Sequence, residues 1–304
     1  MTSLNDLIDN KIKLIINKYK SDLYSYSTTI KNLVLSGGGI KGIAHIGALK
    51  ALEENGLLKN IKNIIGTSIG GIVAGLYCIG YTPDDLLKFI ELFDINKIRG
   101  VNPSQFLTNF GVDDGAKLNL FLEKMFISKN ISVNITFSEL FKKTGYNLIL
   151  TSTCLNDKNI YYFSHELTPN MQILLAMKMT SAFPLWFYPI TYQNKLFVDG
   201  GCIDNYPIRF FQNDLNSTIG IYLSNEKIFL KNINNIEEYL NVLIDCLCES
   251  LTNNLLKDYE KYTIKIDIKF IGIIDLNINN IIKKQIYLSG YNSTISFLKI
   301  NKFI

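Results

Sequence analysis

The sequence predicts a layered α/β domain of the three-layer α/β/α type, with a mainly parallel central sheet. Two observations support this class. Apolar strand-like runs alternate with helix-like segments along the chain, and 47% of the 304 residues are hydrophobic while 19% are charged. No repeat, low-complexity tract or linker interrupts the pattern. We therefore expect a domain at 31–304, preceded by an amphipathic helix packed on it within 1–30.

The first half of the chain shows clear starts and stops for its helices. Gly56 suits the position just after a helix, and Thr82 with Pro83 suits a helix start. Thr136 and Glu139 have the spacing of a capping box that starts a short helix. The predicted elements are strands at 31–35 and 61–65, helices at 41–55, 68–79, 83–93 and 116–126, and a long loop at 95–114.

The second half continues the alternation after a hairpin-like pair of strands. The turn of that pair is Asn156-Asp157, a dipeptide favoured in turns. The predicted elements are strands at 146–154 and 159–163, a helix at 169–180, a strand or hairpin at 190–198, a strand at 218–223, a helix at 236–256, a strand at 263–271 and a closing helix at 278–298.

Composition argues against several classes of function and location. The net charge of +4 is too weak to indicate nucleic-acid binding. Two histidines and five scattered cysteines give poor support for a metal site, so we expect no metal and no cofactor. The N-terminus lacks the features of a signal peptide. The uncharged stretch 63–83 divides better into a strand, a turn and a helix than into a transmembrane helix, so we expect a cytoplasmic protein.

Two glycine-containing turns carry the chemistry. The loop SGGGIKG (36–42) fits the dinucleotide pattern G-x-G-x-x-G, but the second strand ends in Gly66-Thr67-Ser68 and not in the acidic residue that would hold a ribose. That second turn fits G-x-S-x-G, which places a serine on a sharp strand-to-helix turn. Beside such a serine, the bare N–H groups of the glycine loop can form an oxyanion hole, so we expect no nucleotide.

A serine nucleophile needs a base, and the candidates are few. The two histidines are His45, inside the first helix, and His165, after a strand. Neither follows Asp199, so the chain order serine, acid, histidine of α/β-hydrolases cannot be assembled. The remaining candidate is a carboxylate, and Asp199 in the glycine turn FVDGGCIDNYP is the most suggestive one.

At these residues the sequence resembles the patatin-like phospholipase family. SGGGIKG is similar to its oxyanion loop, GTSIG to its nucleophile elbow, and the DGG at 199–201 to its catalytic aspartate motif. The stretches TFSELFKKTGYNLILTSTCLN and TSAFPLWFYPI also match. The resemblance covers roughly 31–210, and it implies a patatin-like fold with 31–304 as the catalytic domain.

The resemblance implies a calcium-independent lipid acyl hydrolase that uses a Ser–Asp dyad. Ser68 would attack the ester and Asp199 would act as its base. Its substrate would be a phospholipid at a membrane surface, bound peripherally. An acyltransferase or thioesterase using the same dyad, and a non-catalytic lipid-binding protein, remain alternatives. The residues expected to form the oxyanion hole are Gly37, Gly38, Gly39 and Ile40, and those expected to contact substrate are Lys41, Ile69, Phe183 and Trp186.

Overall fold

The computed structural model describes most of the chain. The described residues are 29–92, 97, 100–225, 256–268 and 278–304, with single positions at 233, 239, 242, 243 and 246. The helices that we expected within 1–30 and at 236–256 fall outside the described residues, apart from a few positions of the second.

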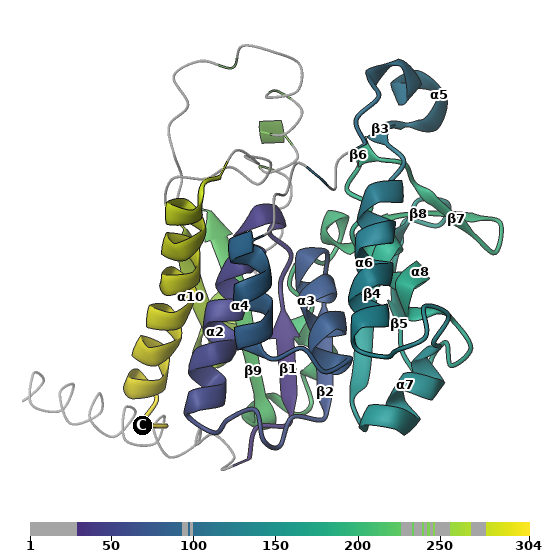
Figure 1. The fold of residues 1–304 in the computed structure, drawn as a ribbon. Helices are drawn as coiled ribbons and strands as arrows, with labels where there is room; N and C mark the ends of the chain where they lie inside the picture. Colours follow the sequence, from purple (N-terminus) through teal and green to yellow (C-terminus); the bar gives the residue numbers. More distant parts are fainter. Residues whose placement is uncertain are drawn as a thin grey trace, which may run out of the picture.

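A mainly parallel sheet forms the centre of the molecule (Figure 1). Its strand order is β10-β9-β1-β2-β4-β8-β7, and β5 pairs with β4. The parallel strands are β1 (Asn32–Leu35), β2 (Asn63–Gly66), β4 (Asn147–Cys154), β9 (Thr218–Asn225) and β10 (Thr263–Ile268). Antiparallel pairing joins β5 (Asn159–Phe163), β7 (Ile190–Tyr192) and β8 (Lys195–Asp199) to them. The predicted fold class and the hairpin β4–β5 are confirmed.

The central strands β1 and β2 are mainly apolar because both faces of the sheet are covered there. Leu33 and Leu35 of β1 belong to a core cluster shared with the helices, whereas Val34 between them belongs to a second cluster. Tyr206 and Tyr222 are buried in this second cluster, on the other face of the sheet. Alternate side chains therefore enter two cores, and the continuous apolar run follows from burial on both faces.

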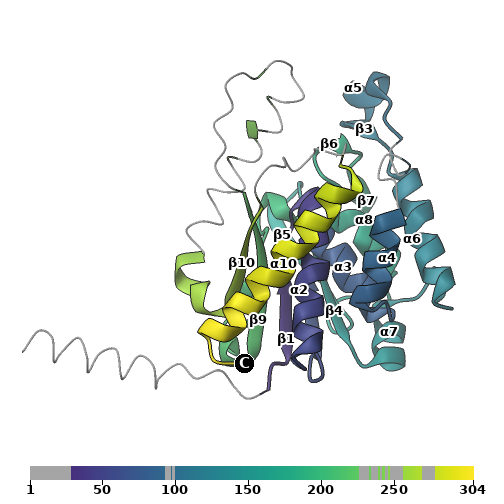
Figure 2. The same ribbon diagram turned by 60° about the vertical axis from the view of Figure 1, so that its left-hand side comes forward.

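Helices α2, α3, α4 and α10 cover one face of the sheet (Figures 1 and 2). The long helix α10 packs so closely on α2 that a Cβ at Gly47 would overlap the Tyr287 carbonyl, and one at Gly290 would overlap that of Ala44. The helices are α2 (Ile43–Glu54), α3 (Ile69–Cys78), α4 (Pro83–Leu92), α6 (Ala116–Ser128), α7 (Phe137–Thr144), α8 (Ile173–Thr180) and α10 (Asn280–Ile300). The predicted capping box of Thr136 and Glu139 starts α7.

The segment expected as a loop at 95–114 contains regular structure, so that prediction was wrong in part. It includes η3 (Pro103–Gln105), α5 (Phe106–Asn109) and β3 (Gly111–Asp113). Strand β3 pairs in parallel with β6 (Leu185–Phe187), a strand that we had not predicted. These elements are three or four residues long and depend on a partner distant in sequence, so no local pattern indicates them.

Candidate active site

The motif residues meet at one edge of the sheet, where β1, β2 and β8 end. Strands β1 and β2 are parallel neighbours with Leu35 opposite Gly66, so the glycine loop and the Ser68 turn leave the sheet side by side. Asp199 is the last residue of β8 and lies opposite Ser152 of β4, the strand on the other side of β2. Residues distant in sequence are thereby brought to one place, at the carboxyl ends of the parallel strands.

Ser68 sits on a strained turn between β2 and α3. Its backbone has φ 55° and ψ −127°, a conformation that residues with a Cβ rarely adopt. The turn is tight: a Cβ at Gly66 would lie 2.5 Å from the Gly70 carbonyl oxygen, and one at Gly70 would lie 2.5 Å from the carbonyl oxygens of Leu35 and Ser36. This geometry explains the two glycines of G-x-S-x-G, and Ser68 itself remains half-buried.

Threonine side chains hold the Ser68 turn from two sides. The Ser68 N–H donates to Thr180 Oγ1 at the end of α8 over 2.9 Å. The neighbouring Thr67 is fully buried, and its hydroxyl is 2.8 Å from Thr151 Oγ1 and donates to the Asp204 carbonyl over 3.0 Å. The strained backbone is therefore fixed by its surroundings.

Asp199 is a buried carboxylate with a raised pKa. Its side chain is 2% exposed, its Oδ1 accepts the Gly201 N–H over 2.7 Å, and its own N–H donates to the Ala182 carbonyl over 2.9 Å. Burial raises the Asp199 pKa to about 7, while Ser68 and the Gly201 N–H act in the opposite direction. Oδ2 is buried and has no hydrogen-bond partner among the residues that the structure describes, although Ser68 is close enough to favour the charged carboxylate. Such a group is poised to exchange a proton near neutral pH.

The glycine loop presents some of its N–H groups and uses others internally. The Gly37 N–H donates to the Asn205 carbonyl over 2.9 Å, so it is occupied, and this differs from its expected role in an oxyanion hole. Gly38 and Gly39 are half-exposed, and Gly39 has φ 55° at the start of η1 (Gly39–Gly42). Their N–H groups, which make no hydrogen bond in the described part of the chain, precede a helix and resemble an anion-binding turn. Ile40, also expected there, is buried in the same turn.

His45 of α2 binds the backbone at the start of the glycine loop. Its ring is fully buried, and Nε2 hydrogen-bonds the Ser36 carbonyl over 2.8 Å, while Nδ1 has no partner in the described part of the chain. Burial lowers the His45 pKa to about 4, so the ring is neutral at physiological pH. The other histidine, His165, stacks on Phe141 with ring centroids 3.7 Å apart. Neither histidine has a hydrogen bond to Ser68 among the contacts that the structure describes.

The four expected substrate contacts lie in different environments. Lys41 is 1% exposed, so in this arrangement it does not present its ammonium at the surface, where a lipid phosphate would need it. Ile69 is half-buried and packs against Gly42, where a Cβ would overlap it. Phe183 and Trp186 are half-buried in the segment that follows Ala182, the partner of Asp199. Their contact with substrate remains a prediction.

Two residues of the site were not predicted from the sequence. Thr180 holds the Ser68 N–H, as described above. Asn205 binds Gly37 through its carbonyl, and its Oδ1 would lie 2.9 Å from a Cβ at Gly201 and would overlap one at Gly37. Asn205 therefore lies between the glycine loop and the DGG turn. The sequence signal for Asn205 is its position in DGGCIDNYP, the same motif that contains Asp199.

The described residues contain neither a membrane-spanning helix nor a metal-binding group. No helix among them is long and apolar enough to cross a membrane. No group of three or more His, Cys, Asp or Glu side chains among them is placed to hold a metal ion.

Comparison with known proteins finds a matching family and similar sequences. The sequence profile of the family described as Patatin-like phospholipase matches residues 33–211. The chain is 38% identical to the uncharacterized protein R571 of Acanthamoeba polyphaga mimivirus over 200 residues, which span 64% of this chain and 66% of that protein. It is 35% identical to the probable lipid hydrolase 463L of Invertebrate iridescent virus 6 over 207 residues, which span 66% of this chain and 70% of that protein.

The fold also matches a solved structure. The crystal structure of VipD from Legionella pneumophila superposes with a TM-score of 0.64 at 19% identity, covering 91% of this chain and 68% of that one. At this identity the likeness concerns the fold alone. Because the family profile covers more than half of the sequence and includes the glycine loop, Ser68 and Asp199, the chain belongs to the patatin-like phospholipase family.

Proposed function

We propose that the protein is a calcium-independent lipid acyl hydrolase of the phospholipase A type, acting on glycerophospholipids at a membrane surface. One observation carries the proposal: Ser68 on a strained turn lies beside the buried carboxyl of Asp199, whose pKa is raised to about 7. A purely structural serine has no need of a strained backbone, and a purely structural aspartate would normally have a charged partner. The family to which the chain belongs supports the same chemistry.

In the proposed reaction, the Ser68 hydroxyl attacks the carbonyl carbon of the lipid ester while Asp199 accepts its proton. The resulting oxyanion is held by the N–H groups of Gly38 and Gly39, where η1 begins. When the ester bond breaks, the lysolipid alkoxide takes the proton from Asp199 and leaves an acyl-serine. Asp199 then accepts a proton from water, which attacks the acyl group, and the fatty acid is released as Ser68 regains its proton.

Calcium independence follows from the same arrangement. The negative charge that develops on the carbonyl oxygen is stabilised by backbone N–H groups at a helix start. No step of the proposed reaction requires a bound cation, so we expect activity to persist in EDTA.

The test compares the wild-type protein with Ser68→Ala on mixed-phospholipid vesicles in EDTA, measuring free fatty acid and lysolipid. We expect the substitution to reduce the rate by at least ~10³-fold, as removal of a nucleophile does in other serine enzymes. Ser289→Ala on α10, whose hydroxyl bonds the Gln285 carbonyl of its own helix, is a matched control that should keep full activity. Equal acid release by wild type and Ser68→Ala would contradict the assignment.

A further inference from the structure

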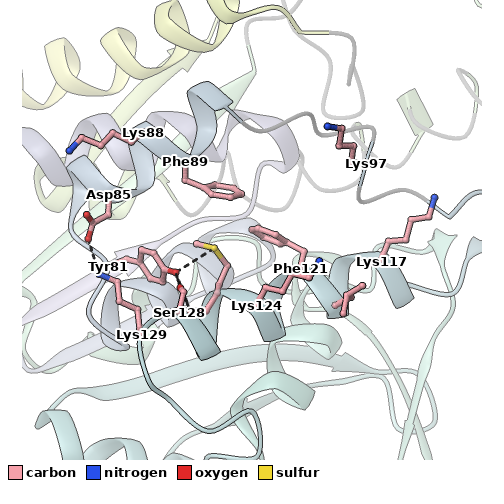
Figure 3. A pocket seen from close by; sticks show the side chains of 12 residues that line it. Tyr81, Asp85, Lys88, Phe89, Lys97, Lys117, Phe121, Lys124, Ser128 and Lys129 are labelled. Atoms are coloured by element: carbon pink, nitrogen blue, oxygen red, sulfur yellow. Dashed lines mark hydrogen bonds and ion pairs between the residues drawn. The ribbon is translucent and has the colours of Figure 1, made fainter.

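A groove with a volume of about 780 Å³ lies between α4 and α6, outside the site described above (Figure 3). Phe89 of α4 and Phe121 of α6 line it and pack against one another, with ring centroids 5.1 Å apart. Leu120 lines the groove and is 52% exposed. The groove therefore combines an apolar floor with an apolar side chain that remains in contact with solvent.

Lysines surround this apolar floor. Those lining it are Lys88, Lys97, Lys117, Lys124 and Lys129. The carboxylate among the lining residues, Asp85, is paired with Lys129 over 2.9 Å, and Lys129 also lies 4.5 Å from the centroid of the Tyr81 ring.

Four of these lysines are exposed, and three of the four belong to α4 and α6. Lys88, Lys117 and Lys124 are exposed and form no ion pair within the described part of the chain. The groove therefore carries an excess of positive charge without an internal counterion, and this charge is complementary to an anionic partner.

The distribution of the lysines indicates what kind of anionic partner fits. Lys88 and Lys117 lie toward opposite ends of the groove and do not converge on one point (Figure 3). A single phosphate would be held by side chains that point at it, often from arginine. A surface with many anionic groups can meet separated ammonium groups at once, and an apolar floor suits the boundary between head groups and acyl chains.

One end of the groove lies near the end of the sheet that carries the glycine loop, Ser68 and Asp199, which we call the catalytic edge. Lys117 lies in the first turn of α6, two residues after Gly115, where a Cβ would lie 3.6 Å from the Phe187 ring. Phe187 pairs with Asp113 in the small β3–β6 sheet, and its segment follows Ala182, which binds the backbone of Asp199. A surface that contacts the Lys117 end therefore lies close to the segment that positions the catalytic base.

We propose that the α4–α6 groove docks the protein on lipid surfaces that carry anionic head groups. Lys88, Lys117 and Lys124 contact the head groups, and Leu120 with the aromatic floor contacts the apolar boundary beneath them. The inference rests on the proposed function in that the partner is the lipid surface, but docking itself requires no catalysis.

The test uses the full chain carrying Ser68→Ala, so that vesicles stay intact during the measurement. Sedimentation is measured with vesicles of phosphatidylcholine alone and of phosphatidylcholine mixed with phosphatidylserine. We expect preferential binding to the mixed vesicles, weakened by salt. The triple variant Lys88→Glu, Lys117→Glu, Lys124→Glu should bind them at least about tenfold more weakly, since each basic residue near such a surface contributes roughly a fivefold factor.

A matched variant makes the same charge change elsewhere. Lys59, Lys62 and Lys142 are exposed and lie near the opposite edge of the sheet, before β2 and β4 begin. Replacing all three by Glu should leave binding within about twofold of the parent, because separated surface charges are largely screened. Leu120→Ser, a change at an exposed position, should weaken binding with little change in its salt dependence.

The outcomes separate docking from catalysis. Equal loss in both triple variants would show an effect of net charge and would overturn the groove assignment, as would equal binding to both kinds of vesicle. Binding that soluble glycerophosphoserine removes would also overturn it, because that result indicates a site for a single head group. With Ser68 restored, the groove variant should hydrolyse a short-chain soluble ester at the wild-type rate, so failure of that assay in the wild type would count against the proposed function alone.

Discussion

The catalytic edge and the α4–α6 groove hold charge in opposite ways. At the catalytic edge a single carboxyl, Asp199, is 2% exposed, and its neighbours Gly201 and Ala182 fix both its side chain and its backbone. In the groove, exposed lysines such as Lys88 and Lys124 form no ion pair with any residue that the structure describes. The first arrangement changes the chemistry of one group, because burial shifts its pKa. The second arrangement places several exposed ammonium groups on one surface and acts through their number.

This difference predicts how each region responds to substitution. Removal of one reacting atom at the catalytic edge should abolish hydrolysis, because the proposed reaction depends on a single positioned and desolvated group. In the groove each substitution should have a small effect, and several should add.

Asp199→Asn is the strongest test of the catalytic edge. The amide keeps the size of the carboxyl and can still accept the Gly201 N–H, but it cannot take the Ser68 proton. We expect kcat on a soluble ester to fall by about 10³–10⁴-fold, the upper part of the range for a general base. Activity within tenfold of the wild type would show that another group takes the proton and that the dyad assignment is wrong.

The meeting of the glycine loop, Ser68 and Asp199 at one end of the sheet was largely predictable because tight turns and the proposed chemistry restrict the residue types. Only glycine tolerates the close contacts at Gly66 and Gly70, and the elbow needs a serine between them. The parallel strands were predictable for a similar reason, since burial on both faces requires apolar runs. The sequence therefore indicated β1, β2, the serine and the aspartate, together with the sheet that brings them together.

What the sequence did not indicate depends on contacts between distant segments. Thr180 is an ordinary helix residue until α8 is placed beside the Ser68 turn. The burial of Lys41 could not be predicted from the sequence, because a lysine in a loop is usually exposed to solvent. The groove was equally hidden, because its lysines alternate with other residues on two helices that become neighbours only in the folded chain.

Thr180 tests whether the strained turn needs its support. Thr180→Val keeps the shape of the side chain and removes the oxygen that accepts the Ser68 N–H. We expect kcat to fall by about 10–10²-fold with KM nearly unchanged, because a small displacement of a reacting group costs this much. Thr180→Ser retains the hydroxyl and should restore most of the rate. If the serine and valine variants were equally impaired, Thr180 would contribute packing and not a hydrogen bond.

The pH dependence of activity gives a smaller but more specific effect. Asp199 must be ionised to act as the base, and its pKa is about 7. We therefore expect kcat/KM for a soluble ester to rise with pH through about 7. At about pH 6, one unit below this pKa, it should be roughly tenfold below its plateau. A profile that is flat from pH 5 to pH 8 would mean that the ionisation of Asp199 does not control the reaction.

The same ionisation should be visible in stability, without any substrate. The folded-state pKa of Asp199 is about 7, whereas that of an unfolded aspartate is about 3.9. Below the lower value the group is neutral in both states. As pH rises from about 3.9 to about 7, the unfolded chain releases this proton while the folded protein retains it, so the folded protein loses up to about 4 kcal/mol of stability from this group, and the loss levels off above pH 7. Asp199→Asn avoids that cost, so we expect it to be more stable than the wild type at pH 8 in urea unfolding.

The difference in the free energy of unfolding between the wild type and Asp199→Asn reports on Asp199 alone, because His45 is present in both proteins. His45 has a folded-state pKa lowered to about 4, so its effect on stability appears between about pH 4 and 6.5 and cancels when the free energies of unfolding are subtracted. The remaining difference should grow from pH 4 to pH 7 and then level off. A difference independent of pH would show that burial does not raise the pKa of Asp199. Its carboxyl would then be exposed to water, as the lysines of the groove are.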